Sequence, residues 1–167
     1  MTEPRWLNPQ ERRTWRAYLR MQRAVEVAAD RQFGAAGISR PEYEVLVPLS
    51  EAEERTLRVR DLARWLGWDR SRIAHQLRRM EQRGLITRSD CPEDARGTMV
   101  RLTDQGYEAV AAAAPGHVEI IRRVLIDLID PDEMAQLTAI AERVAAAAGY
   151  ADLPYPESGG GSAGQRL

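Results

Sequence analysis

Residues 60–106 read RDLARWLGWDRSRIAHQLRRMEQRGLITRSDCPEDARGTMVRLTDQG, and the order of apolar, turn and basic residues in this stretch decides the fold. The stretch contains, in order, a short helix (61–66), a glycine turn (Gly67), a second helix (69–84), a strand (85–88), a polar tip (92–97) and a second strand (99–103). Residues 57–59 alternate apolar and polar side chains, which suits a very short third strand beside the hairpin. The succession predicts a winged helix-turn-helix in a chain that is mainly α-helical with a small β-hairpin wing.

The second helix of this stretch has one apolar and one polar face. Ile73, Leu77 and Met80 recur at the spacing of one helical face and should point into the core. The opposite face carries Ser71, Arg72, His75, Arg78, Arg79 and Gln82. Such a helix fits the major groove of B-DNA, where Arg can bond guanine through two hydrogen bonds, and its first turns lie closest to the bases. A merely solvated charged face is the alternative.

From this helix we predict a set of DNA-contacting side chains, namely Arg70, Ser71, Arg72, His75, Gln76 and Arg79. The hairpin tip adds two more. Arg96 is positioned to enter the adjacent minor groove, where negative potential is concentrated, and Asp94 can orient its guanidinium through a salt bridge. A local salt bridge in the turn, without DNA contact, is the alternative for this pair.

The charge distribution favours the same partner. The chain carries a net charge of −1, but residues 55–101 hold 12 of its 24 basic residues and 6 of its 25 acidic ones, a balance of +6 against −7 elsewhere. A basic block within a nearly neutral chain is typical of proteins that bind phosphate backbones. We therefore predict double-stranded DNA as the partner.

Several other classes of protein are not favoured. The sequence has no Gly-rich phosphate loop, nucleophile elbow or Cys/His metal spacing, so we predict no enzyme, no cofactor and no metal. His117 has no nucleophile as an evident partner, and the single Cys91 cannot form an internal disulfide. No apolar run approaches the ~18 residues of a membrane span, and residues 1–5 lack a signal region. We expect a cytoplasmic protein without a membrane partner.

Helices flank the winged helix on both sides. Asn8, Pro9 and Glu11 predict the start of a helix that runs to about Phe33, and two further helices should follow Thr103 and Asp130. Their apolar stripes exceed what one small winged helix can cover, so we predict a homodimer; folding back onto the same chain is the alternative. The predicted regions are an N-terminal helix in the dimerisation region (1–34), the winged helix-turn-helix (35–106), C-terminal dimerisation helices (107–149) and a flexible tail (150–167).

The winged helix resembles the MarR family of bacterial transcription regulators. The resemblance is carried by Leu62-Ala63 and Leu66, by 79–86 at the end of the second helix, and by 92–97 with 100–106 across the wing. It implies a homodimer that binds a near-palindromic operator and represses transcription until a small ligand or an oxidant releases it. Arg72, His75 and Gln76 depart from the family's usual residue types, so the operator sequence does not transfer. The oxidant-sensing branch has a reactive cysteine in the first helix, whereas Cys91 lies in the wing.

The resemblance also implies an effector pocket between the dimer helices and the winged helix. It brings an aromatic and aliphatic set into range, namely Trp15, Tyr18, Tyr43, Val47 and Trp65, suited to a small aromatic or phenolic ligand. The alternative is that these are core residues. An effector-independent DNA-binding architectural protein remains the second hypothesis for the function, and ligand-dependent release from DNA separates the two.

Overall fold

The computed structural model describes residues 3–91 and 94–150, and the side chains of 94–96 lie outside that description. Its elements are α1 (Pro9–Ala35), α2 (Arg40–Glu51), η1 (Glu53–Arg55), β1 (Thr56–Arg58), α3 (Val59–Leu66), α4 (Arg70–Gln82), β2 (Ile86–Cys91), β3 (Asp94–Leu102), α5 (Asp104–Val124), η2 (Ile126–Leu128) and α6 (Pro131–Ala147). The predicted winged helix-turn-helix, mainly α-helical with a small sheet, is confirmed.

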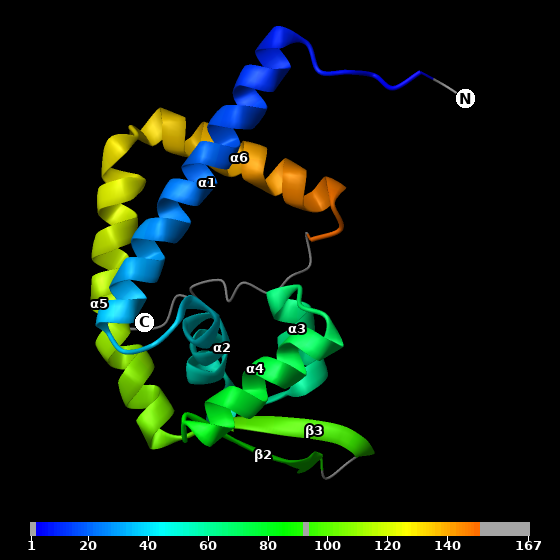
Figure 1. Cartoon of the computed structure of the whole chain (residues 1–167), viewed down its shortest axis with the longest axis vertical. Coiled ribbons are helices and arrows are strands. Elements are labelled where there is room, and N and C mark those ends of the chain that lie inside the picture. The colour runs from blue at the N-terminus through cyan, green and yellow to red at the C-terminus, as the bar shows by residue number, and fades with distance from the viewer. Residues whose placement is uncertain (1–2, 92–93, 151–167) are drawn as a thin grey trace.

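The molecule divides into a packed lobe and a projecting arm. Figure 1 shows α2, α3, α4 and the strands gathered in the lobe, with β2 and β3 extending from it as the wing. The helix α5 runs from the base of the wing to the far end of the molecule, where α6 crosses the N-terminal half of α1. No helix among residues 3–91 and 94–150 combines the length and apolar character needed to cross a membrane.

The wing is a three-stranded antiparallel sheet in the order β1-β3-β2. The short first strand pairs Leu57 with Val100, as its alternating pattern predicted. The hairpin shifts register between Asp90 and Cys91, and its second strand already begins at Asp94. Residues 94–97 of the predicted polar tip at 92–97 therefore belong to β3, and 92 and 93 lie outside the described residues.

One continuous core lies beneath these elements. Its largest fully buried apolar side chains come from every helix of the lobe, from α1 and α5, and from the sheet: Phe33, Leu46, Leu49, Leu62, Ile73, Leu77, Met80, Ile86, Val100 and Val110. The C-terminal part of α1 and the N-terminal part of α5 therefore belong to the core of the lobe. The rest of α1 and all of α6 contribute no buried residue.

Two helices end where packing and backbone geometry decide. A proline inside a helix usually ends or kinks it, but α2 continues through Pro48 to Glu51, because proline removes only one N–H near the helix end and its ring is buried in the core. The helix α5 ends at Val124, because Leu125 leaves the helical region with φ −141° and ψ −64°. The predicted starts at Asn8, Thr103 and Asp130 are confirmed, each by a side-chain cap.

An ion pair between the buried Glu42 and the half-exposed Arg83 joins α2 to the end of α4. The Glu42 carboxylate is 2% exposed, and it accepts hydrogen bonds from the Ser39 N–H at 2.7 Å and the Ser39 hydroxyl at 2.8 Å. Its other oxygen accepts from Arg83 Nη1 at 2.6 Å, while Arg83 Nη2 donates to the Gly37 carbonyl at 2.9 Å. One carboxylate thus fixes the start of α2, and one guanidinium ties the end of α4 to the α1–α2 turn.

A second junction fixes the end of α4 to the start of α5. The Thr103 hydroxyl donates to the Gly84 carbonyl at 2.7 Å and accepts from the Gly106 N–H at 3.0 Å. Gly106 is buried so closely that a Cβ there would lie 2.1 Å from the Leu85 carbonyl oxygen. The glycine is required because backbone, which cannot move aside cheaply, occupies the place of a side chain.

We expect Gly106→Ala to lower the free energy of unfolding by about 1–3 kcal/mol or more, because the methyl group must displace the Leu85 backbone. Chemical denaturation followed by circular dichroism measures the change. Gly34→Ala in α1 is the matched control, since nothing lies within 4 Å of the place that its methyl group would take and alanine favours the helix. Equal stability of the Gly106→Ala variant and the parent chain would contradict this account of the junction.

Glu42 also makes stability depend on pH. Burial alone would raise the pKa of Glu42, but the hydrogen bonds from Ser39 and the charge of Arg83 outweigh it and hold the pKa below its ordinary value. A depressed folded-state pKa means that the stabilisation is complete above the unfolded-state pKa and is lost as pH falls through the folded-state pKa.

We expect Glu42→Gln to lose about 1–3 kcal/mol at neutral pH, because the amide cannot serve both Ser39 donors and Arg83. The difference from the parent chain should shrink as the pH is lowered below about 4. Denaturant unfolding at a series of pH values provides the measurement. Glu133→Gln is the control, because that exposed residue completes the equivalent capping box of α6 without an ion pair among the described residues. A constant difference at every pH would rule out the charged pair.

Candidate nucleic-acid interface

The turn between α3 and α4 is held by backbone geometry. Gly67 adopts the left-handed conformation with φ +63°, and its N–H donates to the Arg64 carbonyl at 3.1 Å. The next N–H, of Trp68, reaches the Ala63 carbonyl at 2.9 Å, which completes the paired bonds of a Schellman motif. Asp69 then caps α4 and accepts from the N–H groups of Ser71 and Arg72 at 2.8 and 2.9 Å. Hydrogen bonds on both sides therefore fix where the second helix begins.

The helix α4 has the two faces that its sequence predicted. Ile73, Leu77 and Met80 are 2% exposed or less. The exposed side chains are Arg70, Ser71, Arg72, Ala74, His75, Arg78, Arg79 and Gln82. Three of the arginine side chains make no hydrogen bond or ion pair among the described residues, namely those of Arg70, Arg78 and Arg79. Their donors are available to an external acceptor such as a phosphate or a base edge.

Gln76 is a correction to the predicted set of DNA contacts. Its side chain is only 6% exposed, and its Nε2 has no hydrogen-bond partner among the described atoms. The position follows Ile73 by three residues and precedes Met80 by four, so the helix turns it toward the core. Gln76 lies on the protein side of α4 and not on the exposed face.

Arg72 is held against an aromatic ring. Its Cζ lies 4.1 Å from the centroid of the Trp68 ring, and the indole itself is 9% exposed. Stacking of this kind contributes about 0.5–2 kcal/mol, depending on exposure. Sequence reasoning named Arg72 but missed Trp68, which lies four positions before Arg72 and directly before the N-cap Asp69.

Glu44 of α2 completes the charged surroundings of Arg72. Burial raises the pKa of Glu44 above its ordinary value, while the positive charges of Arg40 and Arg72 act in the opposite direction. Arg40 in turn bonds Asp30 of α1 at 2.9 Å. A line of alternating charges thus leads from α1 through α2 to the first turn of α4.

Other arginines of the basic block have partners within the protein. Arg88 of β2 binds Glu81 through two nitrogens, and Arg83 binds Glu42. Arg55 lies 3.9 Å over the Tyr107 ring and 3.3 Å from Asp104. The segment 55–101 therefore contains structural arginines besides those that face outward on α4.

The wing residues can be placed only by their backbone. Asp94 and Arg96 both belong to β3, but their side chains lie outside the described part of the chain. Cys91 is 5% exposed at the end of β2, so its thiol is largely screened from solvent. The minor-groove contact of Arg96 stays a prediction.

The five residues predicted for an effector are not gathered around one cavity of a single chain. Trp15 and Tyr18 are exposed on α1 and stack on each other at 5.6 Å. Tyr43 is buried, and Val47 and Trp65 are half-buried against the core. The effector site stays a prediction.

Tyr43 belongs to an aromatic cluster where α1, α2 and α5 meet. Its ring lies 4.4 Å from Phe33 and 4.9 Å from His117. Burial lowers the pKa of His117, which favours the neutral imidazole, and its Nδ1 has no hydrogen-bond partner among the described atoms. Across residues 3–91 and 94–150, no group of three His, Cys, Asp or Glu side chains is arranged to hold a metal ion.

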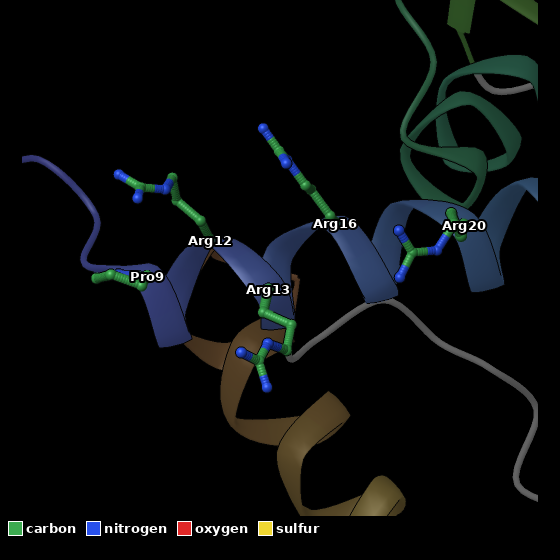
Figure 2. A pocket seen from close by; sticks show the side chains of 5 residues that line it. All are labelled: Pro9, Arg12, Arg13, Arg16 and Arg20. Carbon is green, nitrogen blue, oxygen red and sulfur yellow. The ribbon is translucent and has the colours of Figure 1, made fainter.

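A second concentration of arginine lies on α1, outside the predicted interface. Figure 2 shows Arg12 and Arg16 extending from one side of the helix and Arg13 from the other. With Pro9 and Arg20 they line a shallow hollow of about 330 Å³. This row occupies the projecting arm, far along the chain and in space from α4 (Figure 1).

Known proteins share this architecture. Sco3205, a MarR family transcriptional regulator from Streptomyces coelicolor solved in complex with DNA, is 38% identical; the match covers 94% of this chain and 100% of Sco3205, with a TM-score of 0.84. AbsC, a MarR family transcriptional regulator from the same organism, is 34% identical over 87% of this chain and 99% of AbsC, also with a TM-score of 0.84.

Sequence comparison agrees with these structures. The HTH-type transcriptional regulator YdgJ of Bacillus subtilis is 32% identical over 92 residues, which are 55% of either chain, so this chain spans about half the length of that relative. Residues 38–98, from the end of the α1–α2 turn into the wing, match the MarR family. With the winged helix and its exposed basic helix, these similarities show that the chain belongs to the MarR family of transcription regulators.

Proposed function

We propose that this protein is a sequence-specific DNA-binding regulator of transcription that acts as a homodimer on a near-palindromic operator. The observation that carries the proposal is the exposed face of α4, where Arg70, Arg78 and Arg79 have no partner within the described chain. Arginine in the major groove distinguishes guanine from other bases, and arginine at the groove edge neutralises phosphate. DNA bound to Sco3205, the similar regulator, supports the same partner here.

The projecting arm supports the homodimer. On α1, Trp15, Tyr18 and Leu19 are 52%, 48% and 42% exposed. On α6, Ile140 and Val144 are 49% and 64% exposed. Because the N-terminal half of α1 and all of α6 expose large apolar side chains and bury none, they need a partner surface, and a second copy supplies one by two-fold symmetry. Two-fold symmetry would also present two copies of α4 to two half-sites, whose centres lie about 34–36 Å apart along the duplex.

Repression and release complete the proposal. A dimer seated on an operator blocks access to the DNA, and a small aromatic or phenolic ligand that binds where the arm joins the lobe would change the spacing of the two α4 helices. The aromatic character of this ligand follows from the family resemblance, and Tyr43 of the predicted effector set lies at that junction beside Phe33 and His117. Ligand-dependent loss of operator binding distinguishes this regulator from an effector-independent architectural protein.

Selection from random duplex DNA by the full chain should enrich a near-palindrome of roughly 16–20 bp, because two half-sites one helical turn apart must be read together. Sequencing of the bound fraction measures the enrichment. Enrichment of no sequence, with binding that only falls steeply with salt, would contradict specific recognition.

With that operator in hand, we expect Arg78→Ala to weaken binding by about fivefold or more and to reduce the slope of log affinity against log salt by about 1, because one phosphate or base contact is lost. Fluorescence anisotropy at several salt concentrations provides both values. Arg31→Ala is the control, since Arg31 is also exposed but lies on α1. Unchanged affinity for the Arg78→Ala variant would remove this face of α4 from the interface.

The dimer is tested separately from DNA. We expect Leu19→Asp, and independently Val144→Asp, to yield monomers at micromolar concentration, because a carboxylate buried in an apolar interface costs several kcal/mol. Sedimentation equilibrium measures the association constant. Thr87→Asp introduces the same charge at an exposed position of β2 and should leave association unchanged. If both variants remain dimers, these faces of α1 and α6 are not the interface.

A further inference from the structure

Trp68 occupies the one turn that fixes where α4 begins, and its backbone and ring are both immobilised. Its N–H completes the Schellman motif at Ala63, with Gly67 in the left-handed conformation before it. Its indole is 9% exposed and belongs to the core of the lobe. The ring is therefore a rigid platform at the base of the helix, in contrast to the long side chains around it.

Arg72 is the side chain that rests on this platform. Its N–H is bonded to Asp69, which fixes its backbone, and its guanidinium lies 4.1 Å over the ring centroid. Stacking uses the flat face of a guanidinium and leaves the N–H groups at its edge free to donate. Those groups have no hydrogen-bond partner among the described residues, so the edge is available to an external acceptor.

We propose that Trp68 is a positioning residue for DNA recognition, which holds the Arg72 guanidinium by its face so that its edge reads one base pair of each half-site. This inference rests on the proposed function and adds to it the origin of a specific base preference. Arginine recognises guanine with two parallel hydrogen bonds, whose geometry demands an oriented plane. An unrestrained arginine in the first turn would donate its hydrogen bonds to a phosphate oxygen, a contact that carries no information about the base sequence.

The charges around Arg72 favour the same arrangement. Glu44 of α2 and Asp69 are the carboxylates whose charges interact with it, and neither accepts a hydrogen bond from its side chain. The two carboxylates attract the Arg72 guanidinium and keep it near the Trp68 ring, but they leave its N–H groups free to donate. Arg78 and Arg79, further along α4, have no such platform among the described residues and suit phosphate contact.

The first experiment examines the free protein, without DNA. In the full, 15N-labelled chain we expect the Nε–H proton of Arg72 to be shifted upfield by the indole ring current, and the shift to vanish in Trp68→Leu and persist in part in Trp68→Phe. An Arg72 resonance at its ordinary position in the parent chain would overturn the proposal at once. Should Trp68→Leu fail to fold, as judged by circular dichroism, Trp68→Met replaces it as an apolar residue of large volume without an aromatic face.

The second experiment measures base preference with the operator selected by the parent chain. Competition with operators substituted one base pair at a time should show that Arg72→Ala and Trp68→Leu lose the preference at the same base pair, with about tenfold weaker binding at the parent site. Trp68→Phe should retain the preference. The double variant should bind no more weakly than Arg72→Ala, because the ring acts only through the guanidinium.

The possible results separate the two proposals. Uniform loss of affinity by Trp68→Leu for operator and unrelated DNA, or additive losses in the double variant, would overturn the positioning role and leave Trp68 a structural residue. Full retention of the base preference by Trp68→Leu would overturn it too. If the parent chain selects no sequence although the Arg72 resonance is shifted, the stacking stands but the proposed sequence-specific function fails, and the positioning role fails with it.

Discussion

The contact between the buried Glu42 and the half-exposed Arg83 is the constraint on which the orientation of α4 depends. It unites the start of α2, the end of α4 and, through the Gly37 carbonyl, the turn that follows α1. An ion pair of this kind contributes little net stability compared with well-packed apolar groups, but it is directional, and removal of Arg83 leaves the buried Glu42 carboxylate without its cation. Its main effect is therefore geometric: α4 cannot slide along α2 without stranding a carboxylate that is 2% exposed.

The helix α4 is fixed at both ends, with different chemistry at each. At its start, the Schellman motif at Gly67 and the Asp69 cap define the first residue. At its end, Arg83 and the Thr103–Gly84 hydrogen bond define the direction in which the chain leaves toward the wing. The end of α4 is thereby tied to the turn after α1 and to the start of α5.

Sequence alone predicted the features that are local. The caps at Asn8, Thr103 and Asp130, the two faces of α4 and the short strand at 57–59 each follow from neighbours within a few residues. The misplaced features depend on distant contacts. Gln76 lies at the margin of the helical face, and only packing decides which way it turns. Pro48 remains inside α2 because tertiary burial offsets the loss of one hydrogen bond. Glu42 reads as an ordinary capping residue, since its second partner lies 41 positions away.

The net charge of the chain does not indicate the role of its arginines, because that role depends on whether each one forms an ion pair with a carboxylate of the same chain. Arg40, Arg83 and Arg88 are bound by internal partners and hold helices and wing together. Among the described residues, arginine side chains without such a partner include Arg70, Arg78 and Arg79 on the outer face of α4, and Arg13, Arg16 and Arg20 on α1, where Arg12 donates to the Leu7 carbonyl (Figure 2). An unpaired guanidinium on a rigid helix favours an external acceptor. On α4 the proposed acceptor is nucleic acid, whereas the arginines of α1 share their helix with the exposed Trp15, Tyr18 and Leu19, part of the apolar surface proposed for the homodimer, so the same residue type serves a different surface on each helix.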